Sequence, residues 1–212
     1  MTRLLLVLAA LATLAGCGPR NADYVQPAPE VARGHYVHDG PPSLTLITIR
    51  TNDTGKGSHT ALMINAEERV IFDPAGSFRH SQIRREGDVL VGISPIFWQG
   101  FRSMHARATH RVETQTVVVS PEVASMALAL AYRSGAAPAA HCARNTSNLL
   151  AQLPGFEGMR PTWYPNELEE RFIEATGAET VVYYEDFTPP GGLPANGVLG
   201  IDTTTVASLE ES

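Results

Sequence analysis

A cysteine stands near the predicted start of a helix in the segment APAAHCARNTSNLL, residues 137–150. The free N–H groups and the dipole of a helix N-terminus stabilise an anion, so this position favours the thiolate form of Cys142. The same N–H groups would stabilise an oxyanion if the sulfur attacked a carbonyl carbon. Cys142 is therefore a candidate nucleophile. The alternative is a buried thiol that packs as a small apolar residue.

A cysteine nucleophile needs a base within hydrogen-bond reach and a third polar group that orients this base. His59 follows the glycine-rich loop GKGS and opens a predicted strand over residues 59–65. Asp73 lies in the next predicted strand, residues 69–76, and antiparallel pairing of the two strands would bring its carboxylate close to the imidazole. His141 immediately precedes the cysteine. Neighbouring side chains at a helix start usually diverge, and the sequence leaves the contribution of His141 open.

These motifs carry a family resemblance. The series GSHTALMIN, RVIFDPAG and HCARNTSNLL resembles the circularly permuted branch of the papain-like, NlpC-type cysteine hydrolases, over about residues 44–153. This branch includes lecithin retinol acyltransferase-like enzymes and several bacterial lipoproteins, and its histidine strand precedes its cysteine helix. The resemblance implies that Cys142 is the nucleophile, His59 the base and Asp73 the third polar residue. The residues CARN replace the small Ser-type residue often found after the nucleophile, which leaves the substrate class open.

The function that the resemblance implies is hydrolysis, or acyl or peptidyl transfer, at an amide bond such as that of a cell-wall peptide, or at an ester bond of a lipid. The alternative is a catalytically silent, lipid-anchored binding or scaffold protein that keeps the same fold. Each of the three residues taken alone fits the alternative, whereas their combination favours an enzyme.

The first 17 residues have the pattern of a secretory signal. Arg3 supplies a positive charge, and an apolar run follows from residue 4 to residue 14. This run is shorter than the roughly 20 residues that a membrane-spanning helix requires. Charge, apolar run and small residues follow one another in the order that a signal peptide has.

The signal ends in Leu-Ala-Gly-Cys, which is similar to a bacterial lipobox with Cys17 as the lipidated residue. We therefore expect a lipid on Cys17 to attach the protein to a membrane of the bacterial cell envelope. Gly18 replaces the aspartate that often marks inner-membrane retention, so we favour the outer membrane, facing the periplasm. The chain has only two cysteines, and acylation of Cys17 would leave Cys142 without a disulfide partner. The alternatives are an ordinary signal cut near Gly16 and a Cys17–Cys142 disulfide.

The chain divides into a signal (residues 1–17), a proline-rich flexible tether (18–43), one papain-like domain (44–187) and a loose C-terminal tail (188–212). Alternating or β-branched residues predict strands, and apolar periodicity with capping residues predicts helices. The predicted strands cover residues 43–50, 59–65, 69–76, 88–93, 110–120 and 179–187, and the predicted helices cover 95–108, 121–133, 142–153 and 165–177. Strands come first and helices later. The sequence therefore predicts an α+β fold, with an antiparallel sheet packed against helices in a permuted papain-like core.

Composition and motifs argue against several other functions. The formal net charge is −6 and no dense run of Lys and Arg exists, so nucleic acid is not an expected partner. The sequence contains no His-Glu-x-x-His or Cys-x-x-Cys motif, and we expect neither a metal nor another cofactor. A Gly-x-Ser-x-Gly motif of serine hydrolases is also absent. The expected partners are the membrane and a peptidoglycan peptide or lipid substrate.

Overall fold

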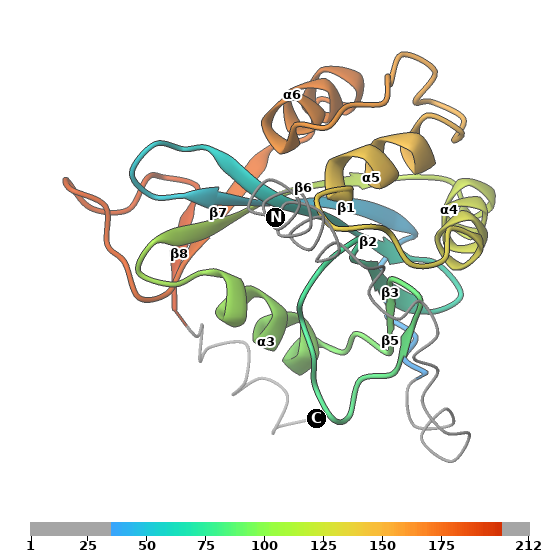
Figure 1. The fold of residues 1–212 in the computed structure, drawn as a ribbon, viewed down its shortest axis with the longest axis horizontal. Helices are drawn as coiled ribbons and strands as arrows, with labels where there is room; N and C mark the ends of the chain where they lie inside the picture. The colour runs from blue at the N-terminus through green and yellow to red at the C-terminus, as the bar shows by residue number, and fades with distance from the viewer. Residues whose placement is uncertain (1–34, 201–212) are drawn as a thin grey trace, which may run out of the picture.

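The computed structural model describes residues 35–200 of the 212-residue chain, and within them one twisted sheet of eight strands (Figure 1). The strand order across the sheet is β4-β5-β3-β2-β1-β6-β7-β8. Every neighbouring pair is antiparallel except β7 and β8, which are parallel. The strands are β1 (Ser43–Thr51), β2 (Gly57–Asn65), β3 (Arg69–Phe72), β4 (Arg85–Glu86), β5 (Val89–Val91), β6 (His110–Val118), β7 (Thr180–Tyr184) and β8 (Gly197–Leu199).

Within residues 35–200, four helices cover the two faces of this sheet. Three of them pack on one face: α4 (Pro121–Arg133), α5 (Cys142–Leu150) and α6 (Pro165–Thr176). Helix α3 (Pro95–His105) packs on the opposite face (Figure 1). None of the helices in the described part of the chain is long and apolar enough to cross a membrane.

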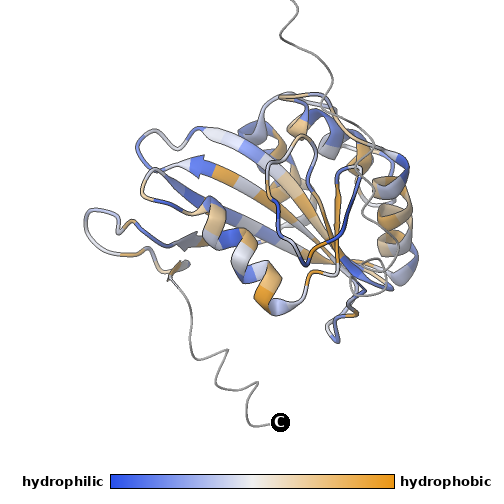
Figure 2. Cartoon of the chain, turned by 60° about the horizontal axis from the view of Figure 1, so that its bottom comes forward, coloured by the Kyte–Doolittle hydropathy of each residue, from blue (hydrophilic) through white to orange (hydrophobic). Residues whose placement is uncertain are grey.

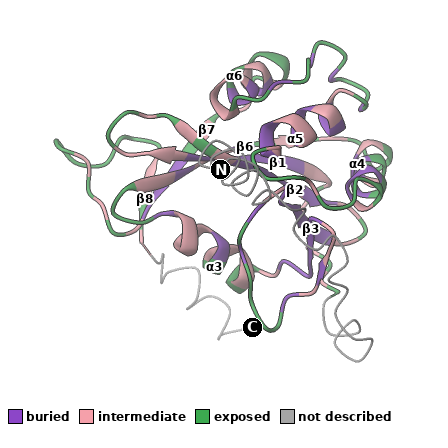
Figure 3. Ribbon diagram, in the orientation of Figure 1, coloured by how far each residue is buried: buried purple, intermediate pink, exposed green. Residues whose placement is uncertain are grey.

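Alternation along the central strand β1 separates two apolar cores. Leu44 and Leu46 point towards the three-helix face, whereas Ile47 and Ile49 point towards α3. All four side chains are buried, because successive residues of a strand face opposite sides and helices cover both. Figure 2 shows hydrophobic residues along the central strands, and Figure 3 shows that these strands are buried. The predicted α+β class and mainly antiparallel sheet are confirmed.

The structure differs from the sequence-based expectations at the sheet edges. Residues 197–199, expected within a loose tail, form the edge strand β8 beside β7. The two-residue strand β4 was not predicted at all. Strand β3 ends at Phe72 and does not continue to residue 76, because Pro74 has no N–H for the ladder. The signal, Cys17, residues 18–34 of the tether and residues 201–212 of the tail lie outside the described residues.

Candidate active site

The candidate site lies where the first turn of α5 meets the N-terminal half of β2. Strand β3 pairs with β2 only from Leu62 to Asn65, so β2 has no β3 neighbour before residue 62. Helix α5 begins at Cys142, as the sequence predicts, and its thiol contacts the backbone N–H of Thr60 on β2. The thiol is buried, with the residue 7% exposed.

His59 and Asp73 lie on the same face of the sheet and are hydrogen-bonded. Asp73 directly follows Phe72, which pairs with Leu62, so alternation places the Asp73 carboxylate and the His59 imidazole on the opposite face from Leu62. His59 Nε2 donates to Asp73 Oδ1 over 2.7 Å. Asp73 is fully buried, and the side chain of His59 is 17% exposed. The predicted proximity of the two residues is therefore observed.

The imidazole of His59 lies between two groups that carry negative charge. Burial lowers its pKa, but hydrogen bonds to Asp73 and Cys142 and the charges of both groups outweigh this effect and raise the pKa of His59 to about 10. Because Asp73 takes Nε2, the ring nitrogen left for the thiol is Nδ1. At neutral pH the ring is therefore a cation.

The environment of Cys142 favours its thiolate. Burial raises the pKa of the thiol, yet the hydrogen bond and charge of His59, together with the backbone N–H groups of Thr60 and Ala143, bring the pKa below its ordinary value. The lowered pKa of the thiol and the raised pKa of the imidazole have one cause, since each charge stabilises the other. The contact between Cys142 and His59 thus stabilises the thiolate and the imidazolium together, and Asp73 orients the ring.

Arg85 is a fourth charged residue of this cluster, and sequence reasoning missed it. Its Nη1 donates to Asp73 Oδ2 over 3.1 Å and its Nη2 donates to the backbone oxygen of Asp73 over 2.9 Å. Burial raises the pKa of Asp73, but His59 and then Arg85 more than compensate, so the pKa stays below its usual value. Arg85 belongs to the short strand β4, for which the sequence carries no periodic signal.

Three hydrogen bonds hold the glycine-rich loop that leads into His59. The backbone N–H of Gly57 donates to the side-chain oxygen of Asn166 on α6, and the amide of Asn166 donates to the Gly55 carbonyl over 3.2 Å. Arg50 on β1 also donates to the Gly55 carbonyl, over 2.7 Å. The start of β2 is therefore fixed by a helix and by the neighbouring strand.

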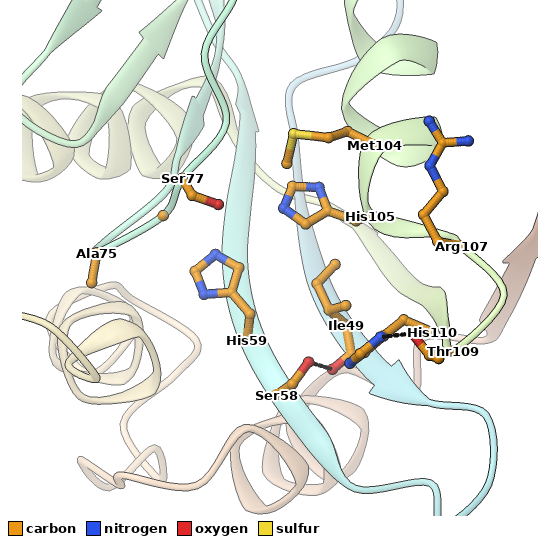
Figure 4. Close-up of a pocket in the computed structure, with 11 residues that line it drawn as sticks. Ile49, Ser58, His59, Ala75, Ser77, Met104, His105, Arg107, Thr109 and His110 are labelled. Carbon is orange, nitrogen blue, oxygen red and sulfur yellow. Dashed lines mark hydrogen bonds between the residues drawn. The ribbon is translucent and has the colours of Figure 1, made fainter.

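A cavity of about 470 Å³ opens on the His59 side of the site (Figure 4). It lies between β2, the loop after β3 and the end of α3, and its lining residues include His59, Ser77, Met104 and His105. The rings of His59 and His105 are nearly parallel, with centroids 6.1 Å apart. Figure 4 shows the His105 ring directed towards His59 and Ser77. His59 lines the cavity, whereas Cys142 does not.

His105 is a second pocket histidine that the sequence analysis did not single out. Its Nδ1 donates to the Phe101 carbonyl over 2.8 Å, which fixes the proton on this nitrogen and leaves Nε2 as an acceptor in the neutral ring. Burial is the main reason that the pKa of His105 is lowered, so the ring is neutral at pH 7. The two neighbouring histidines therefore differ in charge.

The side chain of His141, the residue before Cys142, packs against an aromatic ring. Its imidazole lies edge-on to Trp163, with ring centroids 4.6 Å apart. As the residue that precedes α5 it makes no side-chain capping hydrogen bond. The contact with Trp163 is consistent with the expectation that neighbouring side chains at a helix start diverge.

Comparison of the chain with models of known families, with curated proteins and with solved structures finds no match. The resemblance to permuted papain-like hydrolases therefore stays a prediction. Within residues 35–200, no group of three or more His, Cys, Asp and Glu side chains is arranged to hold a metal ion.

The turn after Asp73 gives a first test of the geometry. A Cβ on Gly76 would lie 1.8 Å from Asp73 Oδ2, so Gly76→Ala must displace the carboxylate from His59. We expect a loss of roughly 1–3 kcal/mol in the free energy of unfolding, measured by urea denaturation. The pKa of His59, measured by NMR titration, should fall towards its ordinary value. In Gly158→Ala, where a Cβ meets nothing within 4 Å, both quantities should stay unchanged. An unaltered His59 titration in Gly76→Ala would contradict the geometry.

Proposed function

We propose that this protein is a cysteine hydrolase, or an acyl or peptidyl transferase, that acts through Cys142 and His59. The observation that carries the proposal is the placement of one imidazole between a buried carboxylate and a thiol at a helix N-terminus. This arrangement supplies the activated nucleophile, the proton carrier and the orienting group that covalent catalysis at a carbonyl requires.

The first half-reaction forms a thioester. The Cys142 thiolate attacks the carbonyl carbon of an amide or ester, and the negative charge develops on the carbonyl oxygen. The backbone N–H groups of Thr60 and Ala143, which lie beside the sulfur, are the donors proposed for this oxyanion. The His59 imidazolium then gives its Nδ1 proton to the leaving amine or alcohol, and the carbon–nitrogen or carbon–oxygen bond breaks.

The second half-reaction regenerates the pair. Neutral His59 takes a proton from water, an amine or an alcohol as this acceptor attacks the thioester carbon. The carbon–sulfur bond breaks, and its electron pair returns to Cys142 as the thiolate. Water gives hydrolysis, whereas an amine or alcohol gives transfer. Asp73 keeps the ring oriented and stabilises its charged form throughout.

The proposed substrate follows from the proposed location. A lipid on Cys17 would hold the domain at the bacterial envelope, where it meets peptidoglycan peptides and membrane lipids. We place amide bonds of cell-wall peptides first and acyl esters second. The second candidate function is a lipid-anchored scaffold without catalysis, which the 7% exposure of Cys142 favours.

The ionisation of Cys142 tests whether the site is catalytic. We expect iodoacetamide to alkylate the thiol with an apparent pKa well below the ordinary value of about 8.5, because His59 and the backbone N–H groups stabilise the thiolate. The thiolate–imidazolium pair exists above this pKa and below the pKa of His59, about 10, so a second change in rate should occur near pH 10. His59→Gln should move the thiol pKa upwards. Ordinary or absent reactivity in the wild type would favour the scaffold.

Substrate tests separate the two enzymatic candidates. The wild-type protein is incubated with muropeptides and, separately, with phospholipids, and products are followed by mass spectrometry. Cys142→Ala should lower the rate of cleavage by at least about 10³-fold, because the nucleophile is removed. His141→Gln is the matched control and should keep wild-type activity, since the ring of His141 faces Trp163. Cleavage that survives Cys142→Ala would rule out the proposed nucleophile.

A further inference from the structure

Strand β4 and the turn that follows it, residues 85–88, contact both halves of the candidate site. On one side, Arg85 on β4 binds the carboxylate and the backbone oxygen of Asp73. On the other side, the turn contacts the loop that begins at Gly135 and leads into α5, whose first residue is Cys142. Arg85, Gly87 and Asp88 therefore connect the segment that carries Asp73 with the loop that leads into α5.

Asp88 makes the connection through its two carboxylate oxygens. Oδ1 accepts from Arg85 Nη2 over 2.9 Å. Oδ2 accepts from the backbone N–H of Ala137 over 2.7 Å and from that of Ala75 over 3.2 Å. The residue is buried, 4% exposed, so these bonds take the place of water around its charge.

Gly87 adds a contact that does not depend on charge. A Cβ on this residue would lie 3.0 Å from the carbonyl carbon of Gly135 and 3.2 Å from its oxygen and its Cα. The φ angle of Gly87 is +54°, in the left-handed region that favours glycine. The turn and the loop before α5 are therefore packed backbone against backbone.

We propose that Asp88 is a positioning residue for the proposed cysteine chemistry, because it fixes the loop before Cys142 relative to the Asp73 that orients His59. This inference rests on the proposed function. The connection runs from the backbone of Ala137 through the carboxylate of Asp88 and the guanidinium of Arg85 to Asp73, and from there to the imidazole. Asp88 does not contact the reacting atoms. It sets the distance between two segments that are far apart in the sequence.

Several titratable and charged groups surround this connection, and their charges affect how the pKa of Cys142 responds to a substitution. They are His59 on β2, Asp73 after β3, Arg85 on β4, His105 at the end of α3, and Cys142 itself. Replacement of Asp88 by asparagine removes one negative charge from this set. Loss of a negative charge would by itself stabilise the thiolate and lower its pKa. Displacement of the loop away from His59 would act in the opposite direction.

The test is the pH profile of Cys142 alkylation by iodoacetamide in Asp88→Asn. An amide that keeps its oxygen on the two backbone N–H groups turns its NH₂ towards Arg85, where two donors face each other. An amide turned the other way loses its bonds to Ala137 and Ala75. In either orientation the connection between the loop and Asp73 is broken, so we expect the thiol pKa to rise. A rise of one unit corresponds to an alkylation rate about tenfold lower at a pH below the thiol pKa. A fall in the thiol pKa would mean that charge alone acts, and would overturn the proposal.

The matched control is Glu86→Gln, which also replaces a carboxylate by an amide, two residues earlier on β4. Glu86 pairs with Arg84 and contacts neither Asp73 nor the loop before α5 in any bond of the described structure. Its variant should keep the thiol pKa of the wild type. An equal shift in both variants would show that the turn acts only through general stability, and would contradict a specific role of Asp88.

A second variant keeps the proposal testable if Asp88→Asn does not fold. Gly87→Ala leaves every charge in place but pushes the turn away from Gly135, and should also raise the thiol pKa. A low thiol pKa in the wild type that both variants leave unchanged would overturn the positioning role and leave the proposed function standing. An ordinary pKa in the wild type would overturn both.

Discussion

The buried carboxylate of Asp73 is the charge that the rest of the site must accommodate. A fully buried, unpaired carboxylate would cost several kcal/mol, so the fold has to surround it with cations and donors. His59 donates a hydrogen bond to Oδ1 of the carboxylate, and Arg85 donates one to Oδ2. Once this pairing is made, the orientation of the imidazole is fixed, and its second nitrogen faces the start of α5. The thiol of Cys142 lies next in this row of alternating charges, and its contact with the imidazole favours the thiolate form.

The sheet topology leaves space beside β2 for this row of charged side chains. Because β3 stops at Phe72, the first half of β2 has no β3 partner, and its backbone N–H groups on that side have to be satisfied elsewhere. The first turn of α5 fills the gap, and the sulfur of Cys142 accepts from the N–H of Thr60. A strand that ended later would pair with this stretch of β2 and exclude the helix. The early end of β3, at a residue followed by aspartate and proline, is therefore a condition for the site.

Part of this arrangement can be predicted from the sequence, and part cannot. The helix start at Cys142 follows from local signals, and the pairing of His59 with Asp73 follows from the period-2 alternation of two adjacent strands. Arg85 and Asp88 could not be found in this way, because a two-residue strand has no measurable period and its place is set by pairing with β5. The same holds for β8, whose three residues form an edge strand only because β7 offers a free side. Local sequence patterns thus predict the positions of Cys142, His59 and Asp73. Arg85 and Asp88, which bind Asp73 or the loop before Cys142, are positioned by long-range packing that such patterns do not reveal.

Access to the site places a constraint on any substrate. The thiol is 7% exposed, and His59 lines the cavity of about 470 Å³. A carbonyl that this sulfur attacks has to reach a nearly buried thiol, which favours a slender, extended substrate segment. The cavity wall opposite His59 carries the neutral ring of His105, whose Nε2 is an acceptor. His59 offers no further donor to this space, because its ring nitrogens bond Asp73 and Cys142. A substrate segment with an N–H group near the scissile bond can donate to His105 Nε2, and a peptide provides such a group while the acyl chain of a lipid does not. The acceptor on His105 therefore argues for the amide candidate over the ester.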